Sequence, residues 1–473
     1  MVFKFLKFLY KIYLKFKNLL YIYCSILLTI FRKIKNSLYS KFKKFLLLYC
    51  QAFLIYFYDI KNLLFFENFF IRKKLLFLNP KNFKKNKLNK KKKKIILVIS
   101  SLSLGGAERQ VLRLAEHLTK KKIKCKIFVM VKNKKNLTYF FPKYIHVDYL
   151  RNKKSKVTNC VDKKFINDLN KLNFFTEEEK RICLGLYNYV KKENPDVIHA
   201  FLDFCCISTG YIGLYLNIRR IVLSTRNVSP HHFMLNRNYF KEFYKSLLKF
   251  KNIILVNNSK AGARSYEKWL NIKKNSIRIT YNVFDFNKKI KLKKIKKKLN
   301  SINFVSVIRL EYEKDPIYIL KLAKNLIKQN LNYYFYIIGQ GHLKIRLKEY
   351  IKKNQLNKNV RLLGIKNNIY DYLNFADFTL LTSVKEGTPN VLLESQKVGT
   401  PVITSDVGGT KETFVKNYSG YLIGKKSIKE DCNIINNIAQ NNIKKKIDLK
   451  IIKKKLKKFS PHKSIQQVLN LYK

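Results

Sequence analysis

Residues 95–118 read IILVISSLSLGGAERQVLRLAEHL, a strand-turn-helix pattern that indicates the fold class. It begins with a short apolar run, IILVISSL, which is typical of a strand buried on both faces of a parallel sheet. A tight turn at Gly105 and Gly106 follows, and Ala107–Leu118 has helical periodicity. The next strand is predicted in KCKIFVMV at 124–131. This βαβ unit places a helix N-terminus at the carboxyl end of a strand, which is the usual ligand edge of such sheets.

The same alternation of apolar runs and helical stretches continues and divides the chain into two halves. Further strands are predicted at 196–202, 220–226, 252–258, 303–310, 333–339, 359–364, 377–383 and 401–406. We therefore predict an α/β fold of two doubly wound parallel-sheet domains that face each other across a central cleft. The first domain spans 95–282 and the second 283–473, with the turn between them in TYNVFD and the last helix packing back on the first domain.

Residues 1–94 form a basic extension with 24 Lys and Arg against two acids, Asp59 and Glu67. Lysines recur at helical spacing among aromatic and aliphatic residues, which predicts amphipathic helices. The longest runs without a charge have 14 residues each, fewer than the roughly 20 needed to span a bilayer. We expect these helices to lie on an anionic membrane surface, and 81–94 to be a Lys-rich linker. The alternative is that they pack on the body of the protein or on another copy.

The formal net charge of +70 has two explanations. A nucleic acid or an anionic membrane would be attracted by such a field. A broad compositional drift toward lysine would produce the same excess, and because no base-reading or stacking motif accompanies it, a nucleic-acid partner is not expected. The eight cysteines include no C-x-x-C pair, so we expect a reducing compartment and no disulfide framework or zinc site.

Two carboxylates stand out in a chain with 99 Lys and Arg against 29 Asp and Glu. They are Glu386 and Glu394 in EGTPNVLLE, with seven residues between them. Glu386 is predicted on the loop after the strand at 377–383, and Glu394 on the next helix, with Thr388 as N-cap and Pro389 as the first helical residue. Free amides at this helix start favour a diphosphate or a polar sugar, whereas the carboxylates favour neutral hydroxyls. The pair therefore indicates a ligand with hydroxylated groups on both sides of a diphosphate.

The motif EGTPNVLLE resembles the E-x7-E signature of the retaining nucleotide-sugar glycosyltransferases of glycosyltransferase family 4. Other segments resemble the family in the same order along about 95–473, namely SLGGAER, VSVIRLEYEKDP, YIIGQGHLK, ADFTLLTSVKEG, GTPVITSDVGGTKE and FSPHKSIQQVLNLY. Each segment alone is a weak signal, but their order is specific. The resemblance implies the GT-B fold, in which two Rossmann-like domains enclose the site.

The resemblance also implies residue roles. Glu386 would bond hydroxyls of the donor sugar and Glu394 those of the ribose. Arg309 and Lys314 would converge on the diphosphate and stabilise the charge of the leaving group, although a solvated pair is the alternative in a Lys-rich chain. The other donor-binding positions implied are Gly387, Thr388, Pro389, Asn390, Gly105 and Gly106. No D-x-D sequence occurs, so no metal is expected, and the nucleotide sugar is a co-substrate rather than a cofactor.

Two further residues at strand ends of the first half are candidates. His199 in PDVIHAFLDF resembles the family's cleft histidine and is counted with Glu386, Arg309 and Lys314 as catalytic. Many members have H-x-H here, whereas this chain has H-A-F, so a buried core histidine is the alternative. Arg226 in STRNVS ends the next strand and either reaches a substrate or is structural.

The resemblance identifies a retaining, metal-independent glycosyltransferase that uses a nucleotide sugar. The basic extension suggests a membrane acceptor, such as a lipid-linked saccharide in cell-envelope polysaccharide, lipopolysaccharide or glycolipid synthesis, and a cytoplasmic protein held peripherally on the inner face of the membrane. Two alternatives remain. One is a nucleotide-sugar epimerase or a phosphorylase, and the other is a non-catalytic polyanion- or membrane-binding protein on the same scaffold.

Overall fold

The computed structural model describes residues 93–103, 105–131, 141–150, 162–230, 236–329, 332–442 and 447–473. The predicted membrane-associating extension therefore lies outside the described residues, apart from its last two positions. Both sheets of the protein belong to one compact unit. Within the described ranges, no helix is long and apolar enough to cross a membrane.

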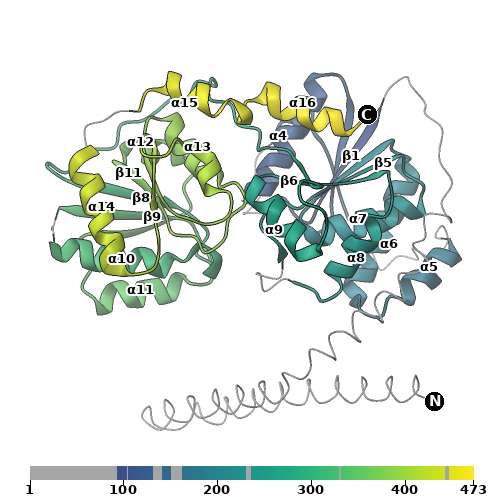
Figure 1. Ribbon diagram of the computed structural model, residues 1–473, viewed down its shortest axis with the longest axis horizontal. Helices are drawn as coiled ribbons and strands as arrows, with labels where there is room; N and C mark the ends of the chain where they lie inside the picture. Colours follow the sequence, from purple (N-terminus) through teal and green to yellow (C-terminus); the bar gives the residue numbers. More distant parts are fainter. Residues whose placement is uncertain are drawn as a thin grey trace, which may run out of the picture. The chain divides into compact units, whose positions relative to one another are not determined.

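The first domain has a parallel sheet in the order β3-β2-β1-β4-β5-β6-β7. Its strands are β1 (Lys94–Ile99), β2 (Lys124–Val129), β3 (His146–Tyr149), β4 (Val197–Phe201), β5 (Arg220–Ser224), β6 (Ile253–Asn257) and β7 (Arg278–Ile279). Its helices are α4 (Gly106–Lys120), α5 (Lys163–Asn170), α6 (Glu177–Glu193), α7 (Asp203–Tyr215), α8 (Phe240–Leu247) and α9 (Lys260–Leu270). Helices cover both faces of the sheet (Figure 1), so β1 and β4 are buried almost throughout.

The second domain repeats this plan, with the strand order β10-β9-β8-β11-β12-β13. Its strands are β8 (Ile302–Val307), β9 (Tyr333–Ile338), β10 (Val360–Gly364), β11 (Phe378–Leu381), β12 (Val402–Ser405) and β13 (Gly420–Ile423). Its helical segments are η5 (Tyr312–Lys314), α10 (Pro316–Gln329), α11 (Lys344–Lys353), α12 (Ile369–Phe375), α13 (Asn390–Lys397), η6 (Thr410–Thr413), α14 (Ile428–Asn442) and α15 (Leu449–Lys455). The predicted α/β fold with two doubly wound parallel sheets is confirmed.

All ten strands predicted from apolar runs are present within a few residues of the predicted limits. Three strands were missed, namely β3, β7 and β13. Each of them is short, and β3 and β7 lie at the edges of the first sheet. An edge strand is less buried than a central strand, so its sequence need not be a continuous apolar run.

The chain ends in η7 (Lys457–Phe459) and α16 (Pro461–Leu471). The apolar side chains of α16, including Ile465, Val468 and Leu471, pack into the same core as strands β1 and β2 of the first sheet. Figure 1 shows α16 beside α4 of the first domain. The last helix of the sequence is therefore part of the first domain's structure.

Candidate active site

The strand order changes direction between β8 and β11, which are neighbours in the second sheet. In open parallel sheets a ligand binds outside the carboxyl ends of the strands at such a point. Arg309 and Lys314 follow β8, and Glu386 follows β11. The topology therefore brings three of the predicted residues to one edge of the sheet.

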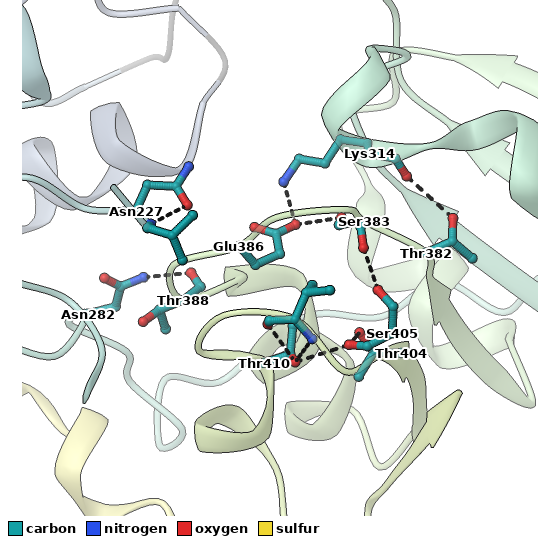
Figure 2. Close-up of polar contacts among 12 residues, drawn as sticks. Asn227, Asn282, Lys314, Thr382, Ser383, Glu386, Thr388, Thr404, Ser405 and Thr410 are labelled. Atoms are coloured by element: carbon teal, nitrogen blue, oxygen red, sulfur yellow. Dashed lines mark hydrogen bonds and ion pairs between the residues drawn. The ribbon is translucent and has the colours of Figure 1, made fainter. Parts of the chain in front are cut away.

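Glu386 and Lys314 form the centre of this edge. Lys314 Nζ donates to Glu386 Oε1 at 2.5 Å, and Ser383 Oγ donates to the same oxygen at 2.7 Å. Figure 2 shows the lysine reaching across the loop to the carboxylate. The Glu386 residue is only 6% exposed. A buried carboxylate needs such a partner, because an unpaired buried charge is costly.

The loop that carries Glu386 is held by contacts of its backbone. Ser405 Oγ donates to the Ser383 carbonyl at 2.5 Å, and the Thr382 hydroxyl donates to the Asp315 carbonyl at 2.9 Å. Gly408 packs against Glu386 with φ of +50°, and a Cβ at this glycine would lie 1.8 Å from the Glu386 carbonyl oxygen. Only glycine fits this approach, which explains the first glycine of the GG in the segment GTPVITSDVGGTKE.

Glu394 lies on α13, and its side chain is 2% exposed. Its carboxylate accepts a hydrogen bond from the guanidinium of Arg109, which comes from α4 in the first domain. Each glutamate of the pair is therefore neutralised by a cation, Lys314 for one and Arg109 for the other. Tyr370 stands close by, and burial together with the Glu394 charge raises the pKa of its hydroxyl to about 12.

The start of α13 differs from the prediction by one residue. Pro389 is the N-cap in extended conformation and Asn390 is the first helical residue, so Thr388 is not the cap. The reason is that the Thr388 hydroxyl donates instead to the Asn258 carbonyl of the first domain at 2.7 Å. Gly387 lies equally close to that domain, because a Cβ there would be 2.4 Å from the Arg226 carbonyl oxygen.

Asparagine and glutamine side chains connect the start of α13 to the first domain. Asn282 Nδ2 donates to the Thr388 carbonyl at 3.1 Å and to Asn390 Oδ1 at 2.7 Å. Figure 2 shows the first of these bonds. Gln110 Nε2 donates to the same Asn390 oxygen at 3.3 Å, and Asn390 Nδ2 donates to the Gly106 carbonyl at 3.4 Å. The predicted glycine turn and the predicted donor loop are thus in direct contact.

Gly105 and Gly106 lie at the N-terminus of α4, where Gly105 is the N-cap. The Glu108 carboxylate folds back over this turn, and a Cβ at Gly105 would lie 2.2 Å from its Oε2. Burial raises the pKa of the Glu108 carboxyl, and the Arg309 guanidinium opposes that rise. Arg309 itself is exposed and has no ion-pair partner among the described residues. Arg309 is therefore a cation near the glycine turn that no described carboxylate neutralises in an ion pair.

His199 is not brought together with Glu386, Arg309 or Lys314. It lies within β4, is 1% exposed, and its Nδ1 shares a 2.8 Å hydrogen bond with the Tyr472 hydroxyl beyond α16. Burial, and then the nearby Arg226 charge, lower its pKa well below the ordinary value, so the ring is neutral at pH 7. This placement agrees with the alternative of a core histidine.

Residue-level prediction missed the polar groups that join the domains, namely Arg109, Gln110, Asn258 and Asn282. Each of them lies in a segment that was quoted for another reason: SLGGAER and its helix, the strand at 252–258, or TYNVFD. The side chains of Arg109, Gln110 and Asn282 and the backbone carbonyl of Asn258 make contacts over more than a hundred positions of sequence, which no local spacing reveals. Among the described residues, no group of three or more His, Cys, Asp or Glu could hold a metal ion.

Residues 287–458 match the family model described as "Glycosyl transferases group 1". The Vi polysaccharide biosynthesis protein VipC/TviE of Salmonella typhi is 21% identical over 361 residues, which cover 70% of this chain and 62% of that protein. The match therefore spans less than two thirds of that relative.

A second relative is the UDP-Gal:alpha-D-GlcNAc-diphosphoundecaprenol alpha-1,3-galactosyltransferase of Escherichia coli. It is 26% identical over 313 residues, which cover 62% of this chain and 79% of that protein. Among solved structures, HepE of Anabaena in complex with UDP superposes with a TM-score of 0.61 and 17% identity. That match covers 80% of this chain and 98% of HepE, and it shows a shared GT-B fold.

Proposed function

We propose that this chain is a retaining glycosyltransferase, because its residues 287–458 match the family model "Glycosyl transferases group 1" and its two sheets form a GT-B fold. It moves a sugar from a nucleotide diphosphate sugar to an acceptor hydroxyl. The acceptor is a lipid-linked saccharide used in bacterial cell-envelope polysaccharide or glycolipid synthesis. The Escherichia coli relative is named for a UDP-Gal donor and a GlcNAc-diphosphoundecaprenol acceptor, and this similarity supports both substrate classes.

One observation carries the proposal, namely the buried Lys314–Glu386 pair at the switch point of the second sheet. A buried pair of this kind, beside a helix N-terminus, supplies an acceptor for sugar hydroxyls and a donor for phosphate oxygens. Arg309, exposed and without an ion-pair partner among the described residues, adds a second cation for the diphosphate. Glu394 on α13 is the corresponding acceptor for ribose hydroxyls, after Arg109 has released it.

In the proposed reaction the bond between the anomeric carbon and the diphosphate oxygen breaks, and the acceptor oxygen bonds to the same face of that carbon. The acceptor proton goes to the departing phosphate oxygen. Lys314, Arg309 and the amides at the start of α13 stabilise the negative charge that develops on the leaving group. No metal is required in this scheme, and no side chain acts as a covalent nucleophile. An adduct between a sugar and the enzyme, trapped and found by mass spectrometry, would contradict it.

The location proposed for the protein is the cytoplasmic face of the membrane, held by the basic extension 1–94. Flotation of the full chain and of a chain starting at residue 95 with anionic vesicles tests this part alone. We expect only the full chain to float with the vesicles. Flotation of the shortened chain to the same extent would contradict the role given to the extension.

The enzymatic proposal is tested by nucleotide release from UDP-, GDP-, ADP- and CMP-sugars, with and without a membrane lipid extract. We expect the extract to stimulate release from one donor in the native chain and in the control Glu349→Ala. Glu349 is an exposed residue of α11 and has no part in the site. Glu386→Ala should lose the stimulated release. If the folded native chain releases nucleotide from none of the donors, the alternative of a non-catalytic binding protein is favoured. If it converts the donor without an acceptor, an epimerase is favoured.

A further inference from the structure

A small cavity lies in the first domain next to the contacts that hold the donor loop. Its volume is about 10 Å³, and its walls include His199, Phe201, Arg226, Thr280 and Val468. These residues come from β4, the end of β5, the segment after β7 and α16. The cavity therefore lies where the first sheet, the interdomain segment and the last helix meet.

Three polar atoms of the cavity walls are buried and have no hydrogen-bond partner within the part of the chain that the structure describes. They are His199 Nε2, Arg226 Nε and Thr280 Oγ1. Buried polar groups are nearly always paired, and an orphaned donor or acceptor costs free energy. Three such atoms around one space therefore need a common explanation.

Arg226 is the wall residue for which a missing hydrogen-bond partner is most costly. Its backbone has φ of +67°, and its Nη2 donates to Asn282 Oδ1 at 2.5 Å. Its guanidinium carbon lies 5.7 Å from the centre of the Phe201 ring, and burial lowers its pKa to about 10. Among the described residues no carboxylate forms an ion pair with it, so its shielded Nε–H has to be satisfied by a neutral acceptor.

The volume of the cavity limits which molecule can fill it. A volume of about 10 Å³ is roughly the least that holds one water molecule, and it is too small for a phosphate or a sugar hydroxymethyl group. One water can accept from the Arg226 Nε–H and complete bonds with His199 Nε2 and the Thr280 hydroxyl. Three partners are the usual number for a buried water.

We propose that one ordered water occupies this cavity and bridges His199, Arg226 and Thr280. It thereby holds the Arg226 guanidinium against Asn282, whose amide donates to the Thr388 carbonyl and to Asn390 at the start of α13. His199, Arg226 and Thr280 are thus positioning residues that act on the donor loop through Asn282. The Tyr472 hydroxyl on the other side of His199 connects the last helix to the same network.

Thr280 offers the matched test, because Thr280→Val removes the hydroxyl at nearly constant shape and Thr280→Ser keeps it. The first measurement is a crystal structure of the full native chain at a resolution that shows ordered waters. We expect a single density peak within about 3.2 Å of all three polar atoms. A cavity without density, or one closed by movement of its walls, overturns the proposal.

The second measurement is steady-state kinetics with the donor that the nucleotide-release panel selects, and it rests on the proposed function. We expect Thr280→Val to raise the donor KM roughly three- to tenfold, as the loss of one hydrogen bond predicts, with kcat nearly unchanged and with Thr280→Ser close to native. Equal KM values in the native and Thr280→Val chains would overturn the positioning role. If the native chain transfers no sugar, the proposed function fails, and the density alone decides the water site.

Discussion

Replacing Lys314 by methionine tests the pair that carries the proposed site. Lys314 Nζ lies 2.5 Å from Glu386 Oε1, with the two side chains 20% and 7% exposed. Methionine keeps the length of the side chain and removes its charge. It therefore leaves the Glu386 carboxylate buried with Ser383 as its one remaining side-chain donor.

The expected loss of stability follows from the distance. With an effective dielectric constant of about 20, two unit charges 2.5 Å apart attract with about 7 kcal/mol, and the desolvation of both groups offsets a large part of this. Removal of one partner should then lower the free energy of unfolding by about 3 kcal/mol. The double variant Lys314→Met/Glu386→Gln has no buried charge at the site and should recover to within about 1 kcal/mol of native.

Guanidinium unfolding followed by far-UV circular dichroism measures both variants. The one tryptophan, Trp269, lies in α9 of the first domain, so its fluorescence would not report the second domain directly. Lys348→Met, at an exposed lysine of α11, is the control and should unfold like the native chain. Both the single and the double variant should lose transfer activity, because the cation is needed for the leaving diphosphate.

Two results would refute this reasoning. Equal stability of Lys314→Met and Lys348→Met would mean that the ion pair is not formed in solution. A double variant less stable than Lys314→Met would mean that Glu386 does not depend on a positive partner.

Three further changes have defined outcomes. Arg109→Ala removes the cation that pairs with Glu394, so it should weaken the contact between the domains and free this carboxylate. In calorimetry, the nucleoside diphosphate should bind this variant about as tightly as the native chain, or more tightly. Tenfold weaker binding would contradict the role of Glu394 as the acceptor for ribose hydroxyls. Gly387→Ala places a Cβ 2.4 Å from the Arg226 carbonyl, so we expect donor KM to rise at least about tenfold, whereas native kinetics would contradict the close approach. Burial raises the pKa of the Asp203 carboxyl to about 6 from its ordinary value of 3.8, so its charged form is disfavoured in the folded state and stability falls as pH rises from about 4 to 6. Asp203→Asn should therefore be more stable relative to native at pH 7.5 than at pH 4, and an equal difference at both pH values in denaturant unfolding would argue against the shift.

The sheets were predictable from the sequence because the buried strands of a parallel sheet are continuous apolar runs. β1 and β4 have almost no exposed residue, and their sequences, KIILVI and VIHAF, contain little that is polar. The edge strand β3, with the sequence HVDY and no buried residue, has no such run and was missed for that reason.

The candidate site was predictable only in part. Lys314 and Glu386 lie on loops that follow β8 and β11, and they meet because adjacent parallel strands end at the same edge of the sheet. The partner of Glu394 was not predictable, since Arg109 lies 285 positions away in the other domain. The N-cap of α13 was misassigned because the Thr388 hydroxyl is used in a contact with Asn258, and tertiary contacts of this kind override local capping preference.

The most direct test of the central claim is calorimetric titration of UDP, GDP, ADP and CDP into the native chain, Lys314→Met and Lys348→Met. This measurement needs no acceptor and locates the donor site. We expect one nucleoside diphosphate to bind the native and Lys348→Met chains equally and to bind Lys314→Met at least about tenfold more weakly, as loss of a charge-assisted contact implies. Equal binding to all three chains, or binding of none of the four nucleotides to the folded native chain, would contradict it.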